Sequence, residues 1–189
     1  MITREEALKL LQKYITTENT IKHMLATEAI MRALAKRFEP EKEAVWAMAG
    51  LLHDLDYEVM EEEKEHGAKT IKILKKENVD LPEEALQAIR AHCYNLHPEW
   101  KPKSLMDWSL FICDSLTGLI VATTLVHPDK KLANVKVKSV MKKFKDKSFA
   151  RGTRRKDIRM CEEKLGLPLR ELVEICLFAM QGISKDLGL

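Results

Sequence analysis

The sequence predicts an all-α protein, a single bundle of about nine helices, and three observations support this class. The chain has 189 residues, a length typical of one domain. It contains only 7 glycines and 6 prolines, too few for the frequent turns of a β-sandwich or β-barrel. Hydrophobic residues make up 46% of the chain and recur mostly at helical spacing. These observations exclude the disordered, fibrous and all-β classes.

The first three helices are predicted from capping residues and apolar spacing. Thr3 and Glu6 have the spacing of a capping box and open a helix that runs to about Ile15. Apolar residues at helical spacing predict a second helix over 19–38, which ends before a proline. That proline opens the third helix, which is apolar on nearly all sides as far as Leu52. We therefore expect the third helix to be buried.

The next three helices carry isolated polar residues on apolar faces. A fourth helix is predicted over 61–78. Asp80 is expected to cap a fifth helix, which has a proline in its first turn and His92 on its apolar stripe. After an irregular stretch with two prolines, Ser104 caps a sixth helix, whose inward row contains one carboxylate, Asp114.

The remainder is also predicted to be helical. Helical spacing continues over 137–144. Thr153 is expected to cap a helix over 154–165, and Gly166 to end it. A last helix over 168–187 ends at the following glycine.

The sequence favours a soluble, cytoplasmic protein without a membrane partner. The amino terminus is charged and leads into no apolar signal region. The longest uninterrupted apolar run, 44–52, is well short of the ~18 residues of a membrane span. The 4 cysteines form no C-x-x-C pair, so we expect buried, reduced thiols.

Charge is distributed unevenly. The segment 130–156 contains 12 basic residues and 1 acidic residue. It carries +11 in a chain of net charge +3, so the remaining residues carry −8. Two interpretations stay open: a solvated lysine face on a helix, or an electrostatic funnel for an anionic substrate.

Histidines and aspartates are the strongest candidates for a functional site. The glycine-rich phosphate and dinucleotide motifs are absent, as is the G-x-S-x-G nucleophile motif. Burying an unpaired carboxylate costs several kcal/mol, which a cation would offset. Nitrogen and oxygen donors without thiolate suit one or two divalent ions of Mn, Fe, Co, Ni or Zn. The candidate donors are His23, His53, Asp54, His66 on the fourth helix, His92 and Asp114.

The order and spacing of these residues resemble the HD-domain superfamily of metal-dependent phosphohydrolases, which are all-α. The resemblance covers about residues 18–125 of a single domain, 1–189, and leaves 126–189 as a basic helical extension. It implies that His23, His53, Asp54 and Asp114 bind a first metal. It further implies that His66 and His92 bind a second metal, with Asp54 bridging the two ions. Some members have an acid where this chain has Tyr57, and some have a second histidine where it has Cys93.

The resemblance implies that a metal-activated water cleaves a phosphomonoester or phosphodiester of a nucleotide-like substrate. Asp54 is then the expected catalytic residue, which orients or accepts a proton. Phosphate is expected to bind arginine, through Arg90 or the cluster of Arg151, Arg154 and Arg155. The expected partner is a small phosphorylated molecule, rather than nucleic acid. Two alternatives remain: a mixed-valent di-iron oxygenase of the same superfamily, and a non-catalytic, metal-bearing module that binds nucleotides or nucleic acid.

Overall fold

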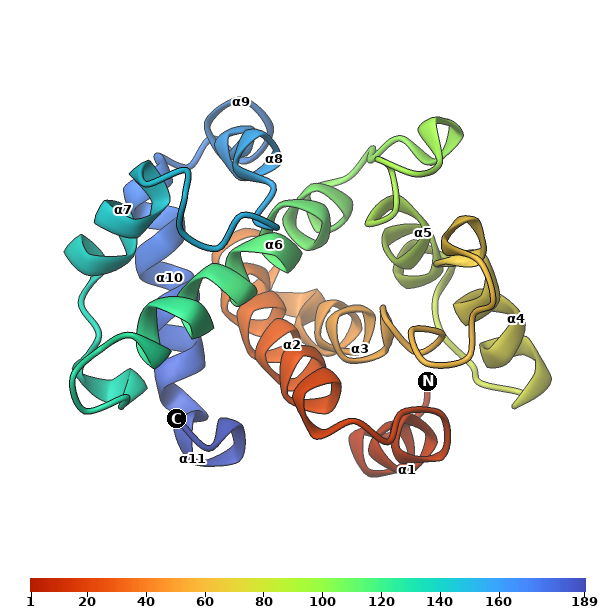
Figure 1. The fold of residues 1–189 in the computed structure, drawn as a ribbon. Coiled ribbons are helices and arrows are strands. Elements are labelled where there is room, and N and C mark those ends of the chain that lie inside the picture. Colours follow the sequence, from red (N-terminus) through yellow and green to blue (C-terminus); the bar gives the residue numbers. More distant parts are fainter.

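A computed structural model describes residues 1–189 and contains helices but no strand (Figure 1). There are eleven α-helices, compared with the nine or so predicted. Their bounds are α1 Arg4–Tyr14, α2 Glu18–Phe38, α3 Glu43–Leu52, α4 Ala68–Lys76, α5 Glu83–Ala91, α6 Leu105–Leu125, α7 Val137–Lys145, α8 Arg155–Arg159, α9 Cys161–Leu165, α10 Leu169–Gly182 and α11 Ser184–Leu187. Four short 3₁₀ turns lie at Pro40–Lys42, Glu63–Glu65, Pro98–Trp100 and Leu132–Asn134.

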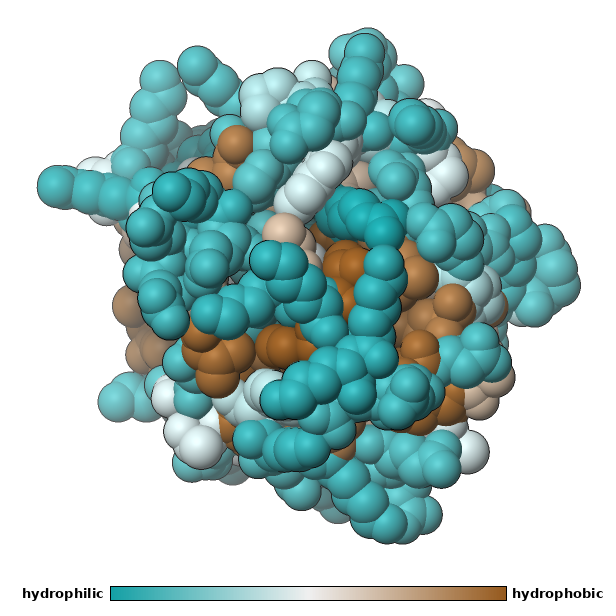
Figure 2. Space-filling view, turned by 90° about the vertical axis from the view of Figure 1, so that its right-hand side faces the viewer, coloured by the Kyte–Doolittle hydropathy of each residue, from teal (hydrophilic) through white to brown (hydrophobic).

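Helices α2, α3 and α6 form the middle of the bundle (Figure 1). Helix α5 packs on α3 and α6, and α4 packs on α5 at one side. Helices α7 to α10 pack along α6 or α10 at the other side, so the last third of the chain covers a face of α6. The side of the molecule that holds α4 and α5 is mostly hydrophilic, with hydrophobic residues exposed between the hydrophilic ones (Figure 2).

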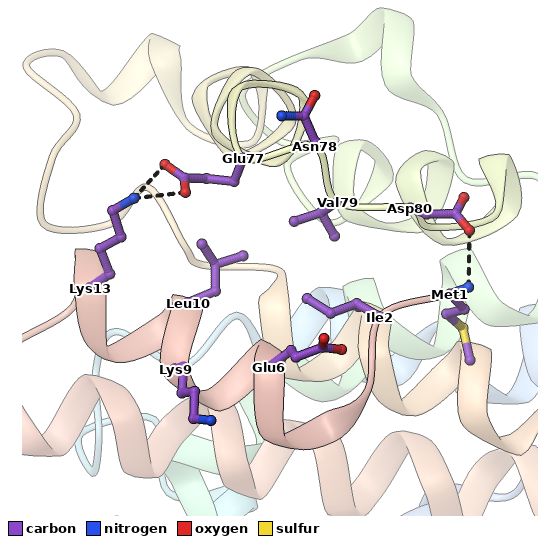
Figure 3. A pocket seen from close by; sticks show the side chains of 10 residues that line it. All are labelled: Met1, Ile2, Glu6, Lys9, Leu10, Lys13, Glu77, Asn78, Val79 and Asp80. Carbon is purple, nitrogen blue, oxygen red and sulfur yellow. Dashed lines mark hydrogen bonds and ion pairs between the residues drawn. The ribbon is translucent and has the colours of Figure 1, made fainter.

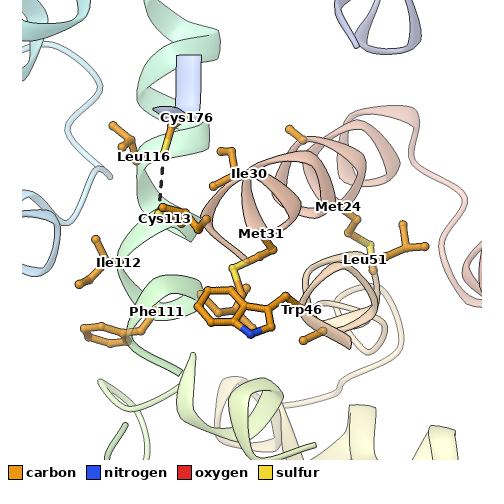
Figure 4. Close-up of a cluster of buried hydrophobic side chains, with 14 of the residues drawn as sticks. Met24, Ile30, Met31, Trp46, Leu51, Phe111, Ile112, Cys113, Leu116 and Cys176 are labelled. Atoms are coloured by element: carbon orange, nitrogen blue, oxygen red, sulfur yellow. Dashed lines mark hydrogen bonds between the residues drawn. The ribbon is translucent and has the colours of Figure 1, made fainter. Parts of the chain in front are cut away.

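One continuous hydrophobic cluster runs through the bundle, from Ala7 to Leu187. Trp46 of α3 and Phe111 of α6 are among its largest fully buried side chains (Figure 4). All four cysteines are buried and free, as the sequence indicated. Two of them, Cys113 and Cys176, have their sulfur atoms 3.8 Å apart, where α6 meets α10.

Helix α6 is long and apolar enough to span a membrane, judged by length and composition alone. However, 67% of its most apolar stretch is buried inside the fold, and α2, α5, α7, α8, α9 and α10 all pack on it. These contacts are those of the central helix of a bundle.

Gly50 lets α3 approach α2 very closely. A Cβ atom at this position would lie 2.9 Å from both Met31 Cγ and the carbonyl oxygen of Thr27. Any larger residue would therefore push the two helices apart. The close approach matters because α2 carries His23, and α3 ends immediately before His53.

The predicted helix over 61–78 is wrong in its first half. Glu63–Glu65 form a 3₁₀ turn, His66 lies in the turn that follows, and α4 begins only at Ala68. Gly67 prevents the helix from starting earlier, because its φ of +77° and ψ of −45° are not helical and are rarely adopted by residues with an L side chain. The physical cause is Asp56, whose carboxylate accepts hydrogen bonds from Gly67 N and Thr70 N, at 2.7 and 3.0 Å. A carboxylate distant in sequence thus caps the start of α4.

Several other boundaries also differ from prediction. The capping boxes at Thr3 and Ser104 are confirmed. Asp80 does not cap α5 and instead accepts a hydrogen bond from the terminal ammonium group, at 2.9 Å. Thr153 makes no cap, because the helix expected over 154–165 starts later and breaks at Met160. The last helix breaks at Ile183, and these interruptions raise the helix count.

Candidate metal centre

The six histidines and aspartates singled out in the sequence meet at one place in the fold. His23 comes from α2, and His53 and Asp54 follow the end of α3. The other three are His66 in the loop before α4, His92 at the end of α5 and Asp114 within α6. Chain segments that are far apart in sequence therefore supply the donors, and the packing of α2, α3, α5 and α6 fixes their positions.

A first group of donors consists of His23, His53, Asp54 and Asp114, whose ligand atoms all lie within 4.8 Å of one another. His23 Nε2 lies 3.0 Å from Asp114 Oδ1 and 3.3 Å from His53 Nε2. His53 Nε2 lies 3.3 Å from Asp54 Oδ1. His53 is fully buried, and Asp54 is 8% exposed.

A second group lies on the other side of Asp54. His66 Nε2 and His92 Nε2 are 3.2 Å apart and lie 3.4 and 3.3 Å from Asp54 Oδ1. The thiol of Cys93 lies 3.3 Å from His92 Nε2. Because Asp54 Oδ1 contacts donors of both groups, this carboxylate has the position of a bridge between them.

Each histidine has its other ring nitrogen, Nδ1, held by an acceptor. The Nδ1–H groups of His53 and His92 donate to the main-chain carbonyls of Gly50, at 2.9 Å, and Ile89. These acceptors lie three residues earlier, at the carboxyl ends of α3 and α5, where helix carbonyls lack partners within the helix.

The two remaining histidines have side-chain acceptors. His66 Nδ1–H donates to Asp56 Oδ1 at 2.8 Å. The hydroxyl of Thr117 donates its proton to the carbonyl of Asp114. Its oxygen, Thr117 Oγ1, is therefore free to accept from His23 Nδ1–H, at 3.0 Å. All four rings are thereby oriented with Nε2 toward Asp54.

These separations fit metal coordination. Two nitrogen donors that each lie ~2.0–2.1 Å from one ion are roughly 2.9–3.4 Å apart when their bonds meet at roughly 90–109°. The His23–His53 and His66–His92 distances of 3.3 and 3.2 Å fall in this range. Four Nε2 lone pairs and two carboxylates repel one another unless positive charge lies between them. The residues present therefore fit one or two divalent cations.

The electrostatics of the cluster lead to the same conclusion. Burial alone would raise the pKa of Asp54, but the charge of His53 and the hydrogen bonds of His53 and His92 together outweigh it and hold this pKa well below its usual range. Burial likewise opposes ionisation of Asp114, yet its hydrogen bond with His23 helps to keep its pKa low. Burial would lower the pKa of His53, but Asp54 and Asp114 raise it to about 10. The buried carboxylates demand compensating positive charge, which protons or metal cations supply.

A cavity of about 730 Å³ opens above the cluster. His23, Asp54, His66 and Asp114 form part of its wall, and Arg154 lies among its other lining residues. Arg154 Nη2 donates to Asp114 Oδ2 at 2.7 Å, and Nε donates to Asp157 at 3.0 Å.

The other three arginines expected to bind phosphate do not line this cavity. Arg90 pairs with Glu83 on its own helix, at 2.8 Å, and Arg151 is exposed. Arg155 donates to five main-chain carbonyls between Lys143 and Ala150, so it holds the turn after α7.

A separate cavity of about 530 Å³ lies between α1 and the turn after α4 (Figure 3). Two ion pairs join its sides, one from Lys13 to Glu77 and one from the terminal ammonium group to Asp80. It contains no histidine and no cluster of metal donors.

Sequence reasoning missed the residues that orient the donors. Asp56 and Thr117 are buried polar side chains that contact His66 and His23. Asp56 was visible as a second acid in an otherwise apolar run, and Thr117 as a hydroxyl one helical turn after Asp114. The close contact at Gly50 was indicated only weakly, by the presence of a glycine inside a predicted helix.

Comparison with known proteins agrees with this geometry. A family model described as HD domain matches residues 20–119. The matched range includes all six donors and excludes Arg154. No curated protein and no solved structure matches the chain. Since the match covers more than half of the sequence, the chain belongs to the HD domain family.

Proposed function

We propose that this protein is a metal-dependent phosphohydrolase that cleaves a phosphomonoester or phosphodiester of a nucleotide-like molecule. The observation that carries the proposal is the cavity that has the histidine–aspartate cluster and Arg154 in its walls. The HD domain family generally contains metal-dependent phosphohydrolases, which supports this class of reaction. A metal centre faced by a guanidinium group suits an anionic ester.

The residues have distinct roles in this proposal. His23, His53, Asp54 and Asp114 would hold one ion, and His66 and His92 would hold a second, with the carboxylate of Asp54 within reach of both donor groups. Divalent ions bound there would lower the pKa of water toward neutrality and polarise a phosphoryl oxygen. Asp54 faces both donor groups, so it orients and accepts the proton of the attacking water.

Arg154 is the proposed phosphate ligand from this chain. Its Nε and Nη2 groups are held by Asp157 and Asp114, which fixes the plane of the guanidinium against the cavity. The remaining Nη1 group carries donors for a phosphoryl oxygen. Burial would lower the pKa of Arg154, but the charge of Asp114 raises it, so the group is always cationic.

Metal content and phosphate release test the assignment of the cluster. In a screen of nucleotides, protein loaded with Mn, Fe, Co, Ni or Zn should release inorganic phosphate from monoesters, or convert diesters into phosphomonoesters. Asp54→Ala should lose most bound metal and all turnover, because it removes the carboxylate that both donor groups face. Asp80→Ala is the control, since its carboxylate is 87% exposed and pairs only with the chain terminus. Full metal occupancy in Asp54→Ala would refute the assignment.

The role of Arg154 has its own test. Arg154→Ala should lower kcat/KM by about 10- to 100-fold, the effect of ~1.5–3 kcal/mol for a charged hydrogen bond, with the metal content unchanged. Arg151→Ala is the matched control, because this arginine is exposed and does not line the cavity. Equal kcat/KM for the parent protein and Arg154→Ala would show that phosphate binds elsewhere.

The alternatives make different predictions. A di-iron oxygenase would show a coupled Fe(II)/Fe(III) signal in electron paramagnetic resonance and no phosphate release. A nucleic-acid-binding module would bind with a steep salt dependence that reports the phosphates neutralised. Arg154 beside the cluster favours the phosphohydrolase, and none of the five lysines between Lys136 and Lys145 lines the cavity.

A further inference from the structure

The cavity over the metal cluster continues into a second depression of about 510 Å³. The two share three lining residues, Asn95, Thr153 and Arg154, so they adjoin along one edge. The second depression is lined only by polar and charged side chains, among them Lys147 and Lys156. It lies beyond residue 119, on a part of the chain that the HD family match does not reach, apart from Asn95.

The charges in this depression are not balanced. Its one carboxylate, Asp157, already accepts from Asn95 Nδ2 at 2.7 Å and from Arg154 Nε at 3.0 Å. Lys147 and Lys156 take part in no ion pair. Two exposed ammonium groups thus remain without an anionic partner beside the entrance to the cavity.

The turn that carries Lys147 is firmly held. Asp146 accepts from the amide and the hydroxyl of Ser148, at 2.9 and 2.6 Å. The guanidinium of Arg155 donates to the carbonyls of Asp146 and Phe149, at 2.9 and 2.6 Å. The backbone on both sides of Lys147 is therefore fixed, which reduces the entropy lost when this lysine binds an anion.

We propose that the substrate carries a second phosphate group, which binds Lys147 and Lys156 while the scissile phosphate lies at the metal cluster. This inference rests on the proposed function and narrows its substrate to small molecules with two or more phosphates. Arg154 lines both depressions, so it contacts the substrate between its two anionic ends. The basic segment 130–156 then has a divided role, because only its last part faces the substrate.

Two non-hydrolysable probes test this inference. They are the phosphonate analogues of adenosine 5′-monophosphate and adenosine 3′,5′-bisphosphate, which differ by one phosphate. Isothermal titration calorimetry on the metal-loaded protein should show tighter binding of the bisphosphate analogue. In the double variant Lys147→Gln/Lys156→Gln, this preference should shrink about 5- to 10-fold, the combined effect of two exposed ion pairs. Affinity for the monophosphate analogue should stay unchanged.

The matched control is Lys138→Gln/Lys142→Gln. These α7 lysines belong to the same basic segment and are exposed, but they line neither depression. The control should keep the full preference, and added salt should weaken that preference in the parent protein. Equal affinity for both analogues in the parent protein, or an unchanged preference in Lys147→Gln/Lys156→Gln, would overturn the second phosphate site. Release of phosphate from a monophosphate ester alongside either result would leave the proposed hydrolase intact.

Discussion

Asp56→Asn is the substitution that tests the organisation of the metal centre most directly. The carboxylate of Asp56 is fully buried and accepts three hydrogen bonds. Its Oδ1 accepts from His66 Nδ1 at 2.8 Å, and its Oδ2 accepts from Gly67 N at 2.7 Å and Thr70 N at 3.0 Å. Asparagine keeps one oxygen and replaces the other with an amide that only donates. In either orientation, at least one buried donor faces another donor.

The magnitude follows from these contacts. A buried donor without an acceptor costs about 1–3 kcal/mol, and the remaining bonds lose the charge that strengthens them. The free energy of unfolding should therefore fall by about 2–4 kcal/mol. His66 also loses the partner that orients its ring, and loss of such a partner weakens metal binding by about 10- to 100-fold. In the proposed two-metal centre, the loss should affect only the ion that His66 and His92 would hold.

Urea denaturation and a metal titration against a competing chelator measure the two effects. Asp80→Asn is the control, because its carboxylate is 87% exposed, and its free energy of unfolding should change by less than ~0.5 kcal/mol. Two ions bound with parental affinity in Asp56→Asn, together with an unchanged free energy of unfolding, would refute the role assigned to this carboxylate.

Three further predictions follow from local geometry. Gly67→Ala should lower the free energy of unfolding, measured in urea, by about 1–3 kcal/mol, because φ is +77° and the new Cβ would lie 2.9 Å from Cys93 Sγ. Adding Cys93→Ala to the same chain should recover only the part of this loss that is due to the contact. Thr117→Val removes the acceptor of His23 Nδ1–H, so metal affinity in the first donor group should fall by about tenfold or more in the same chelator titration. Backbone hydrogen bonds, chiefly that from the Thr16 amide, lower the pKa of Glu58 to about 2. This stabilisation is complete above the unfolded pKa of ~4.3 and is lost as the pH falls toward ~2. The Tm of the parent protein should therefore exceed that of Glu58→Gln at neutral pH, and this difference should disappear in acid.

Each of these predictions has a contradicting result. Full recovery of stability in the Gly67→Ala chain on adding Cys93→Ala would show that backbone strain is absent. Parental metal affinity in Thr117→Val would show that His23 is oriented without the hydroxyl. A Tm difference for Glu58→Gln that persists undiminished in acid would show that the charge of Glu58 is not its source.

Elements governed by local signals could be predicted from the sequence. The capping boxes at Thr3 and Ser104 involve residues three positions apart, and the long apolar repeats of α2 and α6 span several turns. The break at Gly67 could not be predicted in this way, because its cause is the carboxylate of Asp56, which approaches through tertiary packing. Boundaries set by distant partners are invisible to periodicity.

The candidate site shows the same division. The six donors stand out in the sequence because polar residues interrupt apolar helical faces, and the fold brings them together. The arginines could not be ranked, since Arg154 and Arg155 are neighbours with the same chemistry. Only the fold separates them, by directing Arg154 to Asp114 and Arg155 to the carbonyls after α7. Arg154 precedes α8 and Arg155 is its first residue, and this difference decides which arginine lines the cavity.

Arg154 lines the cavity but lies outside the part of the chain that matches the HD domain family. The metal donors lie within residues 20–119, the part shared with the family, whereas Arg154 and both unpaired lysines belong to the later segment. Under the proposed function, metal binding and phosphate recognition would thus depend on different stretches of the chain. Grafting residues 146–157 onto another HD scaffold should transfer substrate preference without altering the metal centre, and changes in this stretch would let new substrates arise while the reaction is conserved.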